Sequence, residues 1–127
     1  MTQTHATVDK VIDPRTDALV GEWLSLQQTA ESLGIRPNRV RQLLSERKLL
    51  AVRRDGGPVV PAAFLRDGQV VKGLSGTLTL LADAGFDDEE TLRWLFTADD
   101  TLPGTPVQAL AENRGTEVRR RAQAMAF

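Results

Sequence analysis

The feature that most constrains the fold of this chain is a pair of short helices joined by a tight turn. Ser25 and Gln28 have the spacing of a capping box, in which each side chain satisfies a backbone N–H left free at a helix start. Gly34 supplies the left-handed residue that ends such a helix, and Pro37 suits the first position of the next helix. This order of helix, glycine turn and second helix predicts a helix-turn-helix over residues 26–46.

The second helix, expected over residues 37–46, has one apolar face and one polar, basic face. Val40, Leu43 and Leu44 recur at helical spacing and form the face expected to be buried. The opposite face and its flanks carry Asn38, Arg39, Arg41 and Gln42, with no carboxylate before Glu46. Such a surface suits the major groove of DNA, where Arg binds guanine and Asn or Gln pairs with adenine.

A short β-hairpin is expected directly after this helix. Residues 51–54 have the pattern of a strand, 55–57 (Asp-Gly-Gly) that of a tight turn, and 58–60 that of the returning strand. Arg53 and Arg54 would then lie at or near the tip, placed to touch a phosphate or the minor groove. The hairpin at 51–60 is therefore predicted to be a wing.

The charges of the chain are unevenly distributed, although the net charge is only −1. Residues 36–54 contain seven basic side chains and a single acid, whereas residues 83–100 contain seven acids and a single arginine. A focused basic patch on an otherwise acidic chain indicates that one face meets phosphate while the rest repels it. A solvated charged helix is the alternative interpretation of either segment.

The second half predicts four helices that begin at or near Leu74, Asp87, Thr105 and Gly115. Helices of this size must pack on one another or on the winged unit. The expected fold is mainly α with a small β-hairpin wing, as a winged helix-turn-helix plus a C-terminal helical bundle. We expect a flexible N-terminal arm at 1–21, the winged helix-turn-helix domain at 22–72 and the helical domain at 73–127.

Composition argues against most enzyme mechanisms. The chain has no cysteine and one histidine, His5, which excludes thiolate zinc sites, a Cys nucleophile and a His-based triad. The four consecutive acids at 87–90 are typical of a solvated helix start. We therefore predict no enzymatic activity, no catalytic residues, no metal and no cofactor. The absence of a long apolar run and of a signal-peptide core predicts a cytoplasmic protein without a membrane partner.

Residues 22–65 resemble the winged helix-turn-helix of the excisionase and MerR-like families. The resemblance is carried by residues 23–35 (WLSLQQTAESLGI), 40–44 (VRQLL) and 50–54 (LAVRR). Arg36 departs from those families, which usually have a Ser or Thr cap before the proline. The missing cap costs about 1 kcal/mol, and an extra basic group beside the DNA would explain why the chain accepts that cost.

A wider resemblance covers most of residues 22–127 and points to an actinobacterial family of winged-helix DNA-binding proteins. It rests on residues 52–54, 68–72 (GQVVK), 93–97 (RWLFT) and 120–126 (RRAQAMA). The resemblance implies a cytoplasmic DNA-binding regulator with a C-terminal helical domain of its own. One member of that family is a substrate of a Ser/Thr protein kinase, phosphorylated in its N-terminal arm. Thr2, Thr4 and Thr7 are the corresponding candidate sites in this chain.

We therefore predict a double-stranded-DNA-binding transcriptional regulator. Asn38, Arg39 and Gln42 are expected to read base edges, and Arg36, Arg41, Arg53 and Arg54 to anchor phosphates. The rival interpretation is a protein-interaction module of antitoxin type, because residues 94–118 are also similar to the toxin-binding domain of certain antitoxins. Either a homodimer or a protein partner could form through residues 74–127. A third alternative is an excisionase-like architectural protein that bends DNA.

Overall fold

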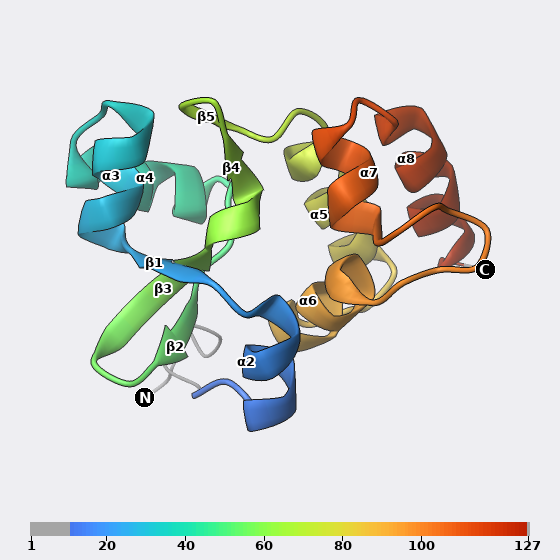
Figure 1. Cartoon of the computed structure of the whole chain (residues 1–127), viewed down its shortest axis with the longest axis horizontal. Helices are drawn as coiled ribbons and strands as arrows, with labels where there is room; N and C mark the ends of the chain where they lie inside the picture. The colour runs from blue at the N-terminus through green and yellow to red at the C-terminus, as the bar shows by residue number, and fades with distance from the viewer. Residues whose placement is uncertain (1–10, 127) are drawn as a thin grey trace.

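The computed structural model describes residues 11–126 and shows two groups of elements lying side by side (Figure 1). The N-terminal group consists of α2 (Pro14–Val20), β1 (Trp23–Ser25), α3 (Leu26–Leu33), α4 (Pro37–Ser45), β2 (Val52–Arg54), β3 (Gly57–Pro61), a single 3₁₀ turn (Ala62–Phe64), β4 (Leu65–Arg66) and β5 (Gln69–Val70). The C-terminal group consists of α5 (Leu74–Asp83), α6 (Asp88–Phe96), α7 (Pro106–Ala111) and α8 (Gly115–Ala124). The mainly helical class with a β-hairpin wing is confirmed.

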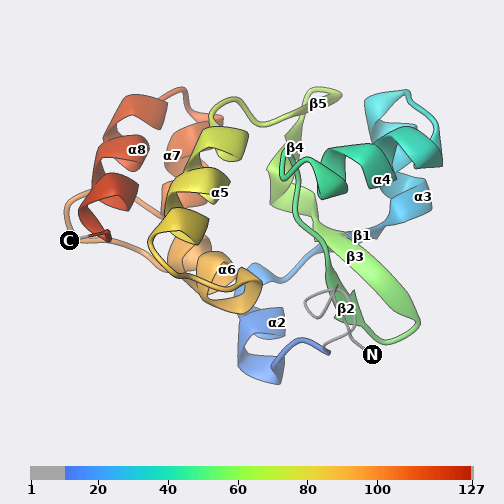
Figure 2. The ribbon, with the colours of Figure 1, turned by 180° about the vertical axis from the view of Figure 1, so that it is seen from behind.

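The helix-turn-helix forms as its local signals predict. Ser25 accepts a hydrogen bond from the Gln28 backbone at 3.0 Å, and the Gln28 side chain accepts one from the Ser25 backbone at 2.9 Å. Gly34 ends α3 in the left-handed conformation, with φ 68°. Arg36 precedes α4 without a side-chain cap, as expected from the sequence. Figure 2 views the molecule from behind and shows α4 in front of α3, with the β2–β3 hairpin extending below them.

The hairpin is part of a larger sheet than the sequence predicts. β2 and β3 pair antiparallel with Arg54 opposite Gly57, so the turn consists of Asp55 and Gly56. β1 pairs with the other edge of β3, which gives the strand order β1-β3-β2. The sequence suggests no strand at 23–25, because three residues that pair with a strand more than thirty positions away carry no recognisable local pattern.

The expectation of a flexible arm over residues 1–21 is wrong for the part that the structure describes. Asp13 caps α2 by accepting from the Arg15 backbone at 2.8 Å, Pro14 occupies its first turn, and Gly21 ends it. Thr16 and Ile12 are buried. The short polar segment is ordered because it packs between the sheet and α6 (Figure 1). Residues 1–10 lie outside the described residues.

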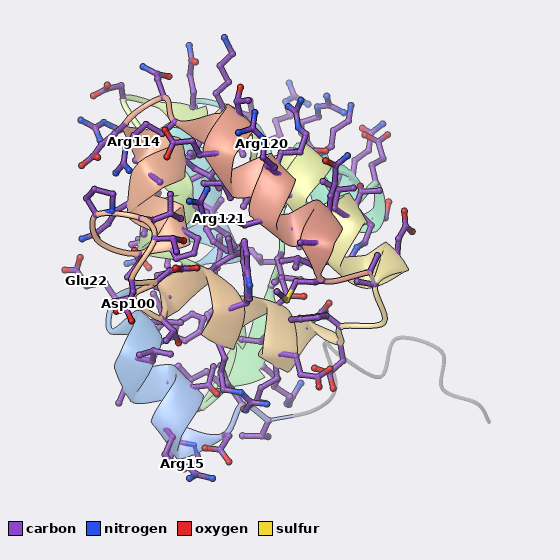
Figure 3. All side chains as sticks on the ribbon, turned by 90° about the vertical axis from the view of Figure 1, so that its right-hand side faces the viewer. Arg15, Glu22, Asp100, Arg114, Arg120 and Arg121 are labelled. Atoms are coloured by element: carbon purple, nitrogen blue, oxygen red, sulfur yellow. The ribbon has the colours of Figure 1, made fainter. Side chains whose placement is uncertain are left out.

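The C-terminal group contains the four helices that the sequence predicts. Asp87 and Glu90 form the expected capping box at the start of α6, with hydrogen bonds of 2.8 and 2.9 Å. Thr105 and Gln108 form a second box at the start of α7. Arg121 of α8 donates to Thr101, in the loop between α6 and α7, at 2.7 Å. Figure 3 shows α8 facing the viewer, with Arg121 labelled. Within residues 11–126 no helix has the length and apolar character to cross a membrane.

A single hydrophobic core joins the two groups. Phe64, at the end of the winged unit, is fully buried and packs on Phe96 of α6 with ring centroids 5.9 Å apart. Val71, in the connection between the groups, and Leu74, the first residue of α5, are also buried. Neither group therefore has a separate interior, since the residues that close the winged unit lie against the helices of the second half.

Candidate nucleic-acid interface

The helix α4 buries one narrow face and exposes the rest. Val40 is completely buried, while Leu43 and Leu44 are half-buried against the core. All four side chains predicted to contact DNA from within this helix, Asn38, Arg39, Arg41 and Gln42, are exposed, and so is Arg36 at its N-terminus. The structure therefore leaves the polar, basic face of α4 open to a partner.

Several arginines of this surface have no ionic partner in the described part of the chain. Arg36, Arg39, Arg41 and Arg53 make no salt bridge within residues 11–126. They are carried by the start of α4, its exposed face and the outer strand of the sheet. A set of exposed cations without intramolecular partners is the arrangement that attracts a polyanion, because no existing ion pair has to be broken.

Gln42 has an intramolecular partner. Its side-chain amide donates to the Glu46 carboxylate at 3.1 Å, one helical turn further along. The pair is exposed, and exposed pairs of this kind contribute only a few tenths of a kcal/mol. Glu46 therefore holds Gln42 weakly in the free protein, and the amide can be released to another acceptor at small cost.

The two wing arginines differ in their surroundings. Arg53 is exposed, and its backbone carbonyl accepts a hydrogen bond of 2.9 Å from Ile12, just before α2. Arg54 donates from Nε to Asp17 of α2 at 2.7 Å, and its guanidinium lies 5.9 Å from the Trp23 ring centre. The Trp23 indole N–H also donates to Asp17, at 3.1 Å. The bond from Arg54, with a smaller contribution from Trp23, lowers the pKa of Asp17 below its ordinary value of 3.8.

Arg47, another member of the basic segment, faces the second half of the protein. It follows α4 in the left-handed conformation, with φ 59°, and donates to Asp88 of α6 at 2.9 Å. Asp88 is buried, so this ion pair is shielded from solvent on one side. The basic segment therefore divides into arginines that face outward and arginines that hold the surface in place.

The sequence gives no indication of Asp17, Trp23, Asp88 and Glu89 as partners of this surface. Asp88 lies 41 positions from Arg47, and Glu89 lies 73 positions from Thr16. Contacts over such distances follow from the tertiary fold alone. Asp17 lies in the segment 1–21 that the sequence predicts to be flexible, so its contact with Arg54 is not expected from the sequence. The three candidate phosphorylation sites, Thr2, Thr4 and Thr7, lie outside the described residues.

The C-terminal group has an open groove of its own. It has a volume of about 480 Å³ and is lined by the aromatic side chains Phe86 and Trp94, by Pro106 and by the charged side chains Glu90, Arg93 and Asp99. Trp94 and Phe86 are only half-buried. This groove lies within residues 74–127, the part of the chain expected to hold a protein partner.

The helix-turn-helix, its exposed basic second helix and the adjoining hairpin define a winged helix-turn-helix protein of the DNA-binding class. Residues 11–65 match the family described as DNA-binding protein Rv2175c, wHTH domain. Residues 71–126 match the family described as Rv2175c C-terminal domain of unknown function. The chain belongs to the Rv2175c family of DNA-binding proteins.

Comparison with individual proteins supports this membership. The chain is 44% identical over 132 residues to the DNA-binding protein Rv2175c of Mycobacterium tuberculosis (strain ATCC 25618 / H37Rv), covering 94% of this chain and 87% of that protein. The NMR structure of Rv2175c is similar, with a TM-score of 0.77, 43% identity and coverage of 94% of this chain and 87% of that one. The resemblance to this family is confirmed, while the narrower likeness to excisionases and MerR-like proteins stays a prediction.

Proposed function

We propose that this chain regulates transcription by binding double-stranded DNA, with α4 in the major groove and the β2–β3 hairpin as the wing. The observation that carries the proposal is the exposed face of α4, whose arginines have no salt-bridge partner within residues 11–126. The relative Rv2175c is itself named a DNA-binding protein. Binding rather than catalysis is then the activity, and a DNA partner implies a cytoplasmic location.

The proposed DNA-binding side chains fall into two groups, those that contact base edges and those that contact phosphates. Asn38, Arg39 and Gln42 are assigned to base edges, because amide and guanidinium groups match the donor and acceptor pattern of adenine and guanine. Arg36, Arg41 and Arg53 are assigned to phosphates. Arg54 joins the phosphate set, since its guanidinium has N–H groups besides the one that binds Asp17.

The phosphate contacts are tested by titrating a labelled random-sequence duplex at low and at physiological salt. Arg53→Ala should weaken binding to all sequences alike and reduce the slope of log affinity against log salt by about one. Arg120→Ala on α8 is the matched control, because it removes the same charge from an exposed site in the other half of the chain (Figure 3). Equal losses in both variants would indicate unspecific attraction, and no binding of the wild type at low salt would contradict the proposal.

The base contacts need a selected binding site, obtained by enrichment from a random duplex library. Gln42→Ala should reduce discrimination at one base pair of that site by about 1–3 kcal/mol. Gln123→Ala, an exposed glutamine on α8, should leave discrimination unchanged. If Gln42→Ala weakened every sequence by the same factor, the assignment of this residue to a base edge would be wrong.

A single winged unit of this size reads only a few base pairs, so we propose that specific recognition requires two copies of the chain. Sedimentation velocity with and without duplex should show two protein chains on one selected site. The alternative is a protein partner held by residues 74–127, for which the groove lined by Phe86 and Trp94 is the specific observation. Stable one-to-one binding to DNA, together with a co-purifying protein, would favour the alternative. A Ser/Thr kinase acting on Thr2, Thr4 or Thr7 remains a proposal that rests on the family resemblance.

A further inference from the structure

The first turn of α6 carries three acidic side chains. Glu90 belongs to the capping box, whereas Asp88 and Glu89 each bind a different part of the proposed DNA-binding surface or its support. Asp88 accepts from Arg47, which follows α4, at 2.9 Å. Glu89 accepts from the hydroxyl of Thr16 in α2 at 2.8 Å and from the Asp13 backbone at 3.2 Å. The Asp88 side chain is 8% exposed and that of Glu89 is 14% exposed. These carboxylates are therefore not a solvated helix start, which is the usual role of acids at that position.

The contact of Asp88 is made just beyond the C-terminal end of α4. Arg47 adopts a left-handed conformation that is unfavourable for any residue with a Cβ. This conformation turns the chain from α4 into the buried residues Leu49 and Leu50. The ion pair with Asp88 favours the same conformation, because it holds the Arg47 guanidinium against α6. The Arg47–Asp88 pair thus links the segment that follows α4 to the first turn of α6.

Glu89 contacts α2, and α2 in turn contacts the wing. Thr16 is completely buried between α2 and α6, and Arg93 also pairs with Glu89, at 3.4 Å. Asp17, the next residue of α2, holds Arg54 of the wing at 2.7 Å. Figure 1 shows α2 between α6 and the sheet; it packs on α6 and bonds to the sheet through Asp17 and Arg54. Two polar contacts, joined by the backbone of α2 between Thr16 and Asp17, therefore connect Glu89 to β2.

We propose that the first turn of α6 is a positioning site for DNA binding, in which Asp88 fixes α4 and Glu89 fixes the wing through α2. The proposal rests on the proposed function. Neither carboxylate touches DNA. Both hold α4 and the wing at a constant spacing before DNA arrives, so that less conformational freedom is lost on binding. The C-terminal group thereby sets the geometry of a surface that the N-terminal group presents.

This role predicts an effect opposite in sign to ordinary electrostatics. Neutralising an acid on a DNA-binding protein reduces its repulsion of phosphate and should raise affinity slightly. Neutralising a positioning acid should lower affinity instead. The sign of the change therefore separates the two roles, whatever its size.

The test compares Asp88→Asn and Glu89→Gln with Asp83→Asn in the full-length chain. Asp83 is an exposed acid at the end of α5 that makes no salt bridge within residues 11–126, so its variant is matched in charge. Binding of a random-sequence duplex is measured well below the unfolding temperature of each variant. We expect Asp88→Asn and Glu89→Gln to bind about three- to tenfold more weakly than the wild type. Asp83→Asn should bind equally or slightly more tightly, and equal affinity of all three variants would overturn the proposal.

A double-mutant cycle separates positioning from general destabilisation. Arg53→Ala should cost less affinity in the Glu89→Gln background than in the wild type, because the wing is no longer held in place. In the Asp83→Asn background its cost should be unchanged. If Arg53→Ala leaves the affinity of the wild type for DNA unchanged, the phosphate role of Arg53 is wrong. The positioning role is then still decided by whether Asp88→Asn and Glu89→Gln bind DNA more weakly.

Hydrogen exchange of the free protein tests the same idea without DNA. Glu89→Gln should accelerate exchange of the amides of β2 and β3, and Asp88→Asn should accelerate exchange at the end of α4. Asp83→Asn should accelerate neither. Unchanged exchange in both positioning variants would overturn the proposal even if the protein failed to bind DNA.

Discussion

Arg36 places a positive charge at the start of α4, at a position where a capping residue would stabilise the helix. It occupies the N-cap of α4 with extended backbone angles, φ −82° and ψ 152°, but its side chain makes no capping hydrogen bond. A Ser, Thr, Asp or Asn at such a position accepts from the second or third backbone N–H of the helix. The start of α4 therefore lacks a contact that the starts of α3, α6 and α7 possess.

We predict that Arg36→Ser raises the free energy of unfolding by about 1 kcal/mol, because it restores the missing cap. The same variant should bind duplex DNA more weakly, since it removes a cation from the proposed surface. Urea denaturation and duplex titration measure the two effects. Arg41→Ser is the control: it removes a cation from the interior of the same helix and should lower both quantities.

Asp17 provides a second prediction, which concerns pH. Its pKa is lowered in the folded protein by the hydrogen bond from Arg54, so folding favours the ionised carboxylate. The associated stability is fully present above the ordinary value of 3.8 and is lost as the pH falls through the lower folded value. The stability difference between wild type and Asp17→Asn should therefore be constant above about pH 5 and shrink below pH 4. Urea midpoints measured from pH 2.5 to 6 test this, and a difference that does not vary with pH would contradict it.

At the residue scale the sequence predicts which side chains are exposed but not which are already bound. The exposure of Asn38, Arg39 and Arg41 follows from the helical period and a buried Val40. The engagement of Arg54 by Asp17 does not, because it depends on a helix that packs against the sheet edge. A run of basic residues in the sequence therefore cannot show which arginines are free to bind DNA and which are already paired within the fold.

The turn between α3 and α4 illustrates what glycine does for an element. Gly34 has φ 68°, and its backbone N–H donates to Ala30 and Glu31 to close α3. A Cβ built on Gly34 meets no atom within 4 Å, so the only penalty of a substitution is conformational. That penalty is about 1 kcal/mol or slightly more for a left-handed residue.

We predict that Gly34→Ala lowers the free energy of unfolding by about 1 kcal/mol. Gly76→Ala, by contrast, should raise it by roughly 0.5–1 kcal/mol, because Gly76 lies inside α5 in an ordinary helical conformation. A Cβ at Gly76 also meets no atom within 4 Å. The same substitution thus has opposite effects at two open positions, which chemical denaturation can measure. Equal signs would show that something other than backbone conformation decides the outcome.

Elements with local signals were predictable, and elements that depend on distant partners were not. The capping boxes at Ser25 and Asp87 place the starts of α3 and α6 correctly. β1 and α2 were missed for different reasons. β1 exists because it pairs with β3, whereas α2 has a local cap at Asp13 and Pro14 but too few apolar residues to be recognised. Its order comes from burying Thr16 against α6.

At the scale of the whole molecule, the shared core determines how the protein unfolds. Each half contains one tryptophan, Trp23 in β1 and Trp94 in α6, and both are half-buried against the same hydrophobic cluster. Phe64 and Phe96 connect the halves directly. Loss of either half would expose buried side chains of the other, so the two should unfold together.

We predict a single cooperative transition for the full chain. Trp23→Phe and Trp94→Phe each leave one tryptophan, so that fluorescence reports on one half at a time. In each variant the urea midpoint from fluorescence should coincide with that from far-UV circular dichroism. Comparison within each variant removes the effect of the substitution itself on stability. A fluorescence transition that separates from the circular dichroism transition would show that the halves unfold independently.

The contact between Phe64 and Phe96 also limits how such a chain can change during evolution. Winged helix-turn-helix units are commonly treated as modules that recombination can join to new partners. Here an exchange of the C-terminal group would uncover Phe64 and remove the carboxylates that hold Arg47 and Thr16. Any replacement would have to supply matching contacts at once. The two halves are therefore expected to be inherited as one unit, with substitutions at their junction occurring in compensating pairs.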